Sequence, residues 1–273
     1  MKTLFFLLLL LFSFALPREL LMATTYPIYY PLLYLAGELY EVKVLISTGT
    51  DVHHYEPKPQ DLRNLKEAKY IFTLGLENWE RKLPVPKERL YLLNQNLPLI
   101  DKDPHLWMSP KSYQAVVDNL YKALLKIDPK NQNIYERKYR EFSKRLKDLD
   151  EKYRQSLSQC KNRWLLSTHL SLRYLARDYG LRAEGLRGVH GEEEPKPSEL
   201  FRLINLMKKE SIKSLFVEEG YQGKAVLKVQ RETGAKIYTI NTSLYPTKEG
   251  GDDYFSIMER NLSAFVEGLD CKR

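Results

Sequence analysis

The amino-acid sequence predicts an α/β fold of two lobes, each with a mainly parallel sheet and flanking helices, joined by one long spine helix. Short β-rich runs alternate with helix-length segments before residue 128, and they do so again after residue 160. Strands separated by helices are typical of βαβ units and parallel sheets. Between these halves, a stretch without glycine or proline repeats its apolar residues at helical spacing, which predicts the connecting helix.

Residues 1–15 have the pattern of a secretory signal peptide. Lys2 precedes an apolar run over residues 4–12, and Ser13-Phe14-Ala15 follows as a cleavage site. A membrane anchor is the alternative, but the run is far shorter than the roughly 20 residues that span a bilayer. We expect cleavage after Ala15 and export to a periplasm. Because no cysteine lies near the cleavage point, we expect no lipid anchor.

The two lobes are expected over residues 16–128 and 160–273. In each lobe, three runs between helix-length segments read as strands. They are residues 20–25, 42–47 and 70–74 in the first lobe and residues 163–168, 213–217 and 236–240 in the second.

The linking segment is expected over residues 129–159, with one helix from about residue 130 to residue 158. Its apolar residues step by three and four almost throughout, while charged residues occupy the other faces. They are Tyr135, Tyr139, Phe142, Leu146, Leu149, Tyr153 and Leu157. Such a helix would be about 43 Å long. A coiled-coil dimer is the alternative, but the stripe is short and mixes aromatic with aliphatic residues, which favours a spine packed on both lobes.

Charge and cysteine content say less about function. The formal net charge of +8 falls to +7 when Lys2 is removed with the signal peptide. We interpret the basic residues as partners of acids on solvated helix faces and expect no nucleic-acid partner. Cys160 and Cys271 belong to no CxxC pair, so we expect neither to bind metal. In an oxidising compartment their even number leaves both a disulfide and two free thiols open.

The five histidines lie at the ends of predicted elements. His53 and His54 follow the second strand, and His169 follows the first strand of the second lobe. His105 lies in a turn that opens a helix, and His190 lies in an acidic loop with glycines. Ligands of parallel α/β sheets bind outside the carboxyl ends of the strands. A single histidine is more often structural, but several at such ends in both lobes favour a site for zinc or a similar metal.

Three motifs surround these histidines: residues 49–59 (GTDVHHYEPKP), residues 103–110 (DPHLWMSP), and Ser167-Thr168-His169 followed by YLA at 174–176 and YGL at 179–181. They resemble the ligand segments of the metal-binding receptors of zinc and manganese ABC importers, the cluster A-I solute-binding proteins. Further similar segments are residues 215–218, 232–236 and 254–262. The resemblance covers nearly the whole chain after the signal peptide, with its motifs in the same order.

The resemblance implies two α/β lobes joined by a long helix, with a divalent metal held between them and delivered to a membrane permease. It implies that His53, His105 and His169 are the ligands and that His54 points elsewhere. It implies no catalytic residue, and no cofactor apart from the metal that is carried. We expect a monomer.

The sequence departs from the family pattern in two places. The fourth ligand is usually an aspartate, but Asn241 stands at the matching position, so Asn241, Glu218 or water remains open as the fourth ligand. The histidine-rich loop of many zinc-specific members is absent between Leu97 and His105. Manganese receptors of the family typically place an acid where His169 stands, and imidazole suits zinc better than manganese. We therefore expect Zn²⁺, with Mn²⁺ or Fe²⁺ as alternatives.

Two functions from other classes are alternatives to metal capture. A zinc-dependent hydrolase would use three histidines, an open position and a general base, for which Glu218 is the candidate, but the chain has no HExxH motif. An adhesin or a receptor for a small organic solute would use the same scaffold without metal. We expect a binding protein and no enzyme.

Overall fold

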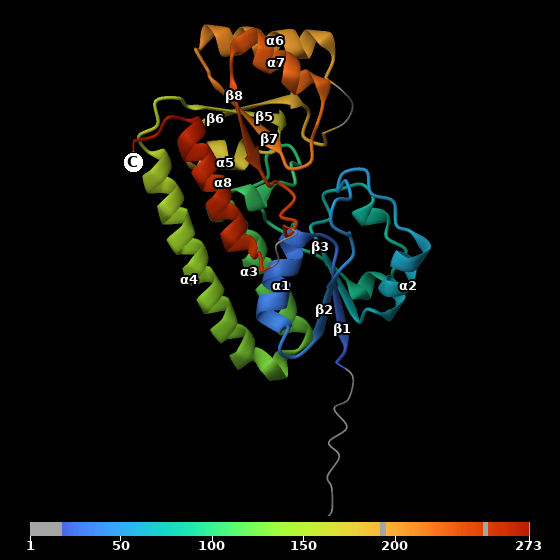
Figure 1. Cartoon of the computed structure of the whole chain (residues 1–273). Helices are drawn as coiled ribbons and strands as arrows, with labels where there is room; N and C mark the ends of the chain where they lie inside the picture. Colours follow the sequence, from blue (N-terminus) through green and yellow to red (C-terminus); the bar gives the residue numbers. More distant parts are fainter. Residues whose placement is uncertain (1–17, 192–194, 248–250, 273) are drawn as a thin grey trace, which may run out of the picture.

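The computed structural model describes residues 18–191, 195–247 and 251–272. They form two lobes, each built on a four-stranded sheet, with helix α4 (Gln132–Leu157) running along one side of both (Figure 1). The predicted fold class is confirmed. The predicted signal peptide, residues 1–15, lies outside the described residues. Within the described ranges, every helix is too short or too polar to cross a membrane.

The first sheet has the strand order β2-β1-β3-β4, and all its pairs are parallel. Its strands are β1 (Leu20–Ala23), β2 (Glu41–Val44), β3 (Tyr70–Thr73) and β4 (Leu90–Leu92). Alternate residues of β1 point to opposite faces of the sheet. Leu21 therefore packs in the core that includes α1 (Tyr26–Ala36) and α3 (Pro110–Ile127), whereas Leu20 packs in a separate cluster with Leu65 of α2 (Pro59–Glu67).

The second sheet repeats this topology with the order β6-β5-β7-β8, again parallel throughout. Its strands are β5 (Trp164–His169), β6 (Arg182–Arg187), β7 (Ser214–Glu218) and β8 (Lys236–Ile240). Helices α6 (Pro197–Lys209) and α7 (Lys224–Thr233) cover its outer face, and α5 (Arg173–Asp178) and α8 (Tyr254–Gly268) lie on the other (Figure 1).

The six predicted strands are confirmed, with ends that differ by at most three residues. Strands β4 and β6 were not predicted, and both lie at a sheet edge. Edge strands are only half covered, so their side chains need not be apolar. Strand β6, with the sequence RAEGLR, is polar over most of its length, and β4 has only three residues. Strand β6 lacks the apolar signal on which the prediction depended, and β4, although its sequence is LYL, is too short to be recognised.

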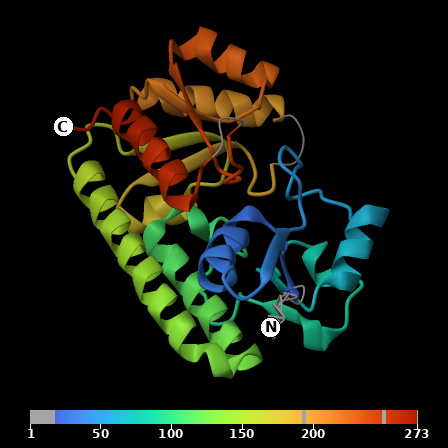
Figure 2. The same cartoon turned by 60° about the horizontal axis from the view of Figure 1, so that its bottom comes forward.

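Helix α4 is the predicted spine, and it follows a 3-10 turn, η4 (Pro129–Asn131). It packs along α3 and α1 of the first lobe and α8 of the second, and Figure 2 shows α3 and α8 lying along it. Six of the seven residues of its apolar stripe are buried, and Tyr139 is partly buried. Because the chain itself covers this stripe, no apolar seam is left for a coiled-coil partner.

Short 3-10 turns occupy several of the remaining connections. They are η1 (Glu80–Lys82), η2 (Lys87–Arg89) and η3 (Leu106–Met108). The turn η3 leads into α3, whose N-cap Ser109 accepts a hydrogen bond from the backbone N–H of Ser112. This confirms the helix that was expected to follow the turn of His105. It begins at Pro110, where proline is tolerated because its missing N–H would have no partner in the helix.

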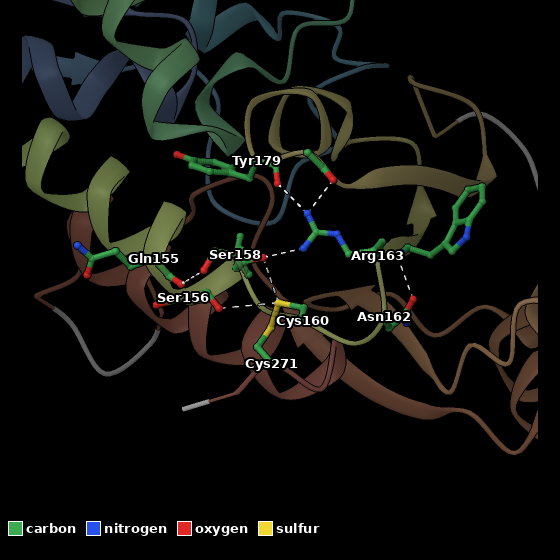
Figure 3. The surroundings of a disulfide bond; sticks show 11 residues. Gln155, Ser156, Ser158, Cys160, Asn162, Arg163, Tyr179 and Cys271 are labelled. Atoms are coloured by element: carbon green, nitrogen blue, oxygen red, sulfur yellow. Dashed lines mark hydrogen bonds between the residues drawn. A yellow bond between two sulfur atoms is a disulfide. The ribbon is translucent and has the colours of Figure 1, made fainter.

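A disulfide joins Cys160 to Cys271 (Figure 3). The two residues face each other across an antiparallel bridge, and Asn162 N–H donates to the carbonyl of Leu269 at 3.0 Å. The bond therefore ties the segment after α8 to the segment between α4 and β5. Of the two alternatives that the sequence left open, the structure contains the disulfide.

Candidate metal centre

The candidate site lies where the carboxyl ends of the two sheets face each other. In each sheet the strand order changes direction between the two middle strands, β1 and β3 in the first lobe and β5 and β7 in the second. Parallel α/β sheets bind their ligands at such a point. A cavity of about 340 Å³ opens there. It is lined by the loops that follow β2, β6, β7 and β8, by the end of β5 and by the segment before α3.

His53, His105 and His169 meet in this cavity. Nitrogen atoms of the three rings all lie within 4.8 Å of one another. The Nε2 atoms of His105 and His169 are 3.1 Å apart. Two nitrogens bound to one zinc ion in a tetrahedral site are about 3.3 Å apart, given Zn–N distances of about 2.0–2.1 Å. The three rings thus fit a single ion.

The loop after β2 presents His53. Asp51 Oδ1 accepts a hydrogen bond from the backbone N–H of His53 at 2.9 Å. This contact forms an Asx-turn, in which a short side chain bonds the backbone two residues further on. Trp79 holds the same loop, because its Nε1 donates to the carbonyl of Val52 at 2.8 Å. His54 is exposed and pairs with Asp51 at 2.9 Å. It is not among the residues that line the cavity.

His105 is buried directly before η3. Its backbone N–H donates to Asp103 Oδ1 at 3.0 Å. The other lobe holds this segment from two sides, since Tyr174 Oη donates to the carbonyl of Asp103 and Tyr254 Oη to the carbonyl of Trp107. His105 is therefore fixed by side chains of both lobes.

His169 is the last residue of β5, a central strand of its sheet. Its carbonyl accepts hydrogen bonds from Ser171 N–H and Ser167 Oγ. Gly185 of the neighbouring strand β6 allows this end of β5 to lie close, because a Cβ at that position would be 2.7 Å from Leu170 N and 3.0 Å from the carbonyl carbon of His169.

A carboxylate lies behind each of the three rings. Glu77 Oε1 is 2.9 Å from His53 Nδ1, and Asp103 Oδ1 is 2.8 Å from His105 Nδ1. Glu218 Oε1 contacts His169 Nδ1. A carboxylate only accepts, so it stabilises the tautomer with the proton on Nδ1. The lone pair of each ring is then on Nε2, which is the arrangement typical of histidines that bind zinc.

Burial sets the charge of these groups. It lowers the pKa of His105 well below its usual value, an effect to which neighbouring His169 and His53 add. Burial also raises the pKa of Asp103 to about 6. Burial would raise the pKa of Glu218 as well, but the contact with His169 outweighs it and holds that pKa below its usual range. His105 is thus a neutral ring at physiological pH, as a metal ligand must be.

The sequence gives Asn241, Glu218 and water as the candidates for the fourth ligand. Glu218 lies behind His169, and it also accepts a hydrogen bond from Thr242 Oγ1 at 3.0 Å. Asn241 lines the cavity, and its amide nitrogen donates to Glu219 and to the carbonyl of Tyr245, both at 2.8 Å. Glu218 and Asn241 are thus held by other partners, and neither belongs to the cluster of His53, His105 and His169.

Glu77 is a site residue that was not predicted. It lies in the turn after β3, and buried Glu80 holds that turn by accepting hydrogen bonds from the backbone N–H groups of Leu76 and Glu77 at 3.1 and 3.2 Å. Gly75 supplies the positive φ of 70° that the turn needs. The signal was present: Glu77 follows a predicted strand at its carboxyl end, as His53 does.

His190 also lies at the site. Its Nδ1 is 3.5 Å from Glu77 Oε2, and its ring centroid is 5.5 Å from that of His53. The sequence placed His190 only in an acidic loop.

Comparison with known proteins places the chain among metal-uptake proteins. Residues 21–268 match the family described as zinc-uptake complex component A, periplasmic. The chain is 27% identical to the high-affinity zinc uptake system protein ZnuA of Bacillus subtilis (90% of this chain, 86% of that protein). It is 26% identical to the manganese ABC transporter substrate-binding lipoprotein PsaA of Streptococcus pneumoniae (86% and 84%). It is 28% identical to the iron-binding protein YfeA of Yersinia pestis (86% and 81%).

The fold is that of solved metal-binding proteins. The structure of the laminin-binding protein Lmb of Streptococcus agalactiae, described as having adhesin and metal-transporting activity, superimposes with a TM-score of 0.85. The match covers 92% of this chain and 99% of that one at 26% identity.

Proposed function

Because the chain belongs to the family of periplasmic zinc-uptake components, we propose that it captures Zn²⁺ outside the cytoplasm and delivers it to the membrane permease of an ABC importer. The observation that carries this proposal is that ring nitrogens of three histidines lie within 4.8 Å of one another. Each ring is backed by a carboxylate, and the rings come from both lobes. A site shared between lobes can be opened by a small movement of one against the other.

The choice of zinc rests on the ligands His53, His105 and His169. Neutral imidazoles suit zinc, whereas carboxylates suit manganese. The three carboxylates of the site contact the Nδ1 atoms of the rings and supply negative charge there. Relatives named for zinc, manganese and iron occur at similar identity. Mn²⁺ and Fe²⁺ are therefore the alternatives that a competition experiment has to include.

The cellular setting belongs to the same proposal. We infer a signal peptide over residues 1–15, lobes over 16–128 and 160–273, and a link over 129–159. We also infer a mature monomer in the periplasm without a lipid anchor. Family membership supports a position outside the cytoplasm. The manganese relative in Streptococcus pneumoniae is named a lipoprotein, so membrane attachment differs among relatives.

A zinc hydrolase is the rival from another class. It would need a base beside the metal-bound water, and Glu218 is the candidate for that role. Glu218 contacts His169 Nδ1 and is bound by Thr242, while Arg187 Nη2 lies 3.4 Å from it. A carboxylate engaged in this way orients a ligand, which favours capture over catalysis.

Tryptophan fluorescence tests the proposal. The ring of Trp107 lies 5.1 Å from that of His105, and its Nε1 donates to the carbonyl of Thr242 in the other lobe. Zn²⁺ added to the metal-free protein should change this fluorescence and saturate at one tight equivalent, whereas sugars and amino acids should have no effect. The response should be unchanged in His54→Ala, whereas His169→Ala should need more Zn²⁺ to reach saturation. A wild-type protein that responds to an organic solute and not to Zn²⁺ would support a receptor for small organic solutes.

A further inference from the structure

A second cluster of metal-ligating side chains lies directly outside the three histidines. It consists of His53, Glu77 and His190, whose ligand atoms lie within 4.8 Å of one another. Two histidines and one glutamate form a common ligand set for catalytic zinc. Glu77 and His53 come from the first lobe and His190 from the second, so this cluster also bridges the lobes.

Glu77 faces a histidine with each of its oxygens. Oε1 is 2.9 Å from His53 Nδ1, and Oε2 is 3.5 Å from His190 Nδ1. The second distance exceeds that of an ordinary hydrogen bond. Both carboxylate oxygens are thus directed at imidazole nitrogens, and the side chain of Glu77 is only 8% exposed.

His190 is held at the mouth of the cavity. Its side chain is 41% exposed, against 8% for His53 and 2% for His105. Arg187 fixes the loop, since its Nη1 donates to the carbonyl of Gly191 at 2.6 Å and its Nε to the carbonyl of Thr168 at 3.2 Å. Exposure therefore falls stepwise from His190 through His53 to His105, along a line from solvent to the innermost ring.

His53 belongs to both clusters, but it can serve only one at a time. A neutral imidazole has one lone pair. With the proton on Nδ1, the lone pair is on Nε2 and is available to an ion held with His105 and His169. With the proton on Nε2, the lone pair is on Nδ1, which lies 2.9 Å from Glu77 Oε1. When the ion moves inward, Nε2 of His53 releases its proton to water and Nδ1 takes a proton from water. The ring therefore stays neutral, and the reverse exchange accompanies outward movement.

We propose that His190, Glu77 and His53 form an outer entry site that binds the incoming divalent transition metal before His53 passes it to His105 and His169. This inference rests on the proposed function and adds a route to the inner site. An intermediate on the route lowers the barrier for entry and for release alike. Removing His190 should therefore slow both steps, which distinguishes it from a ligand of the inner ion.

Stopped-flow measurement of tryptophan fluorescence, with Trp107 as the reporter beside His105, tests the route with Zn²⁺ as the probe. In His190→Ala, the rate constants for zinc association and for zinc dissociation to a chelator should each fall at least threefold. His54→Ala, an exposed histidine of the first lobe that pairs with Asp51, is the matched control and should keep both rates. Unchanged rates in His190→Ala would overturn the inference. So would faster dissociation, because it would make His190 a ligand of the inner ion.

Calorimetry isolates the outer site at equilibrium. The double variant His105→Ala/His169→Ala should bind one weak equivalent of Zn²⁺ through the outer cluster. The triple variant, which also carries His190→Ala, should not bind this equivalent. Equal zinc binding by the double and triple variants would contradict the inference. A wild-type protein without any tight zinc equivalent would instead contradict the proposed function, so the two failures differ. If the buried substitutions prevent folding, the rates of the single His190→Ala variant still decide.

Discussion

Each imidazole of the inner cluster is oriented by a carboxylate on its Nδ1. In the proposed zinc site, these contacts would help three neutral ligands to hold a divalent cation. The negative charges of Glu77, Asp103 and Glu218 would lie one ring away from a bound ion. Such outer partners of zinc-bound histidines make a large contribution to affinity.

Removing one ring tests the ligand set. We expect His105→Ala and His169→Ala each to weaken zinc affinity by at least about tenfold, since three protein ligands fall to two. His54→Ala, which leaves the inner cluster intact, is the control. Competition against a chelator of known affinity measures the loss. Equal losses in the control and the two variants would show that the ligand assignment is wrong.

Removing one carboxylate tests the orienting role. Glu218→Gln keeps the shape of the side chain but replaces the charge that acts on His169. We expect zinc affinity to fall by about 10–100-fold, the usual effect of losing such a partner. Glu232→Gln, on the outer helix α7, should leave the affinity unchanged. A Glu218→Gln variant with wild-type affinity would exclude the proposed role.

Protons should compete with zinc. Imidazole nitrogens must be unprotonated to bind a metal, so the affinity should fall as the pH drops below about 6. Burial lowers the pKa of His105, so this ring stays neutral as the pH falls. Fewer than three protons should therefore be taken up for each ion released at pH 5. Calorimetry from pH 8 to pH 5 measures both quantities, and a flat affinity over this range would argue against histidine ligation.

At the scale of elements, the ends of parallel strands position the site. His53, Glu77, His169 and Glu218 all lie at or after the carboxyl end of a strand. The strand-end rule could therefore predict the region of the site from the sequence, and it identified His53 and His169. The rule could not identify Glu77 as a site residue, because a single glutamate after a strand has no distinguishing pattern. Only the structure shows that Glu80 fixes its turn.

The disulfide is an element whose contribution can be measured. Cys160 and Cys271 are 111 residues apart, so the bond restricts a long loop of the unfolded chain. Replacing both with serine should lower the free energy of unfolding by about 2–4 kcal/mol. Zinc affinity should stay the same, because the bond lies outside the residues that line the cavity. Urea unfolding of oxidised wild type and variant checks this, and equal midpoints would contradict it.

At the scale of the whole molecule, one helix supports both lobes. The stripe of α4 is buried against both lobes, and Tyr153 Oη donates to the carbonyl of Met258 in α8 at 2.7 Å. A continuous helix bends little, so we expect metal release to involve small tilts of the lobes. Apolar periodicity predicted this helix well. The cross-lobe bonds of Tyr174 and Tyr254 could not be predicted, because they join residues about 70 and 150 positions apart and local pattern carries no such information.

Anomalous X-ray scattering from crystals of the zinc-loaded protein, recorded at the zinc edge, tests the central claim most directly. The account predicts one strong peak about 2.0–2.1 Å from the Nε2 atoms of His53, His105 and His169. A peak bound by other side chains, or one within reach of only a single histidine of this set, would contradict it.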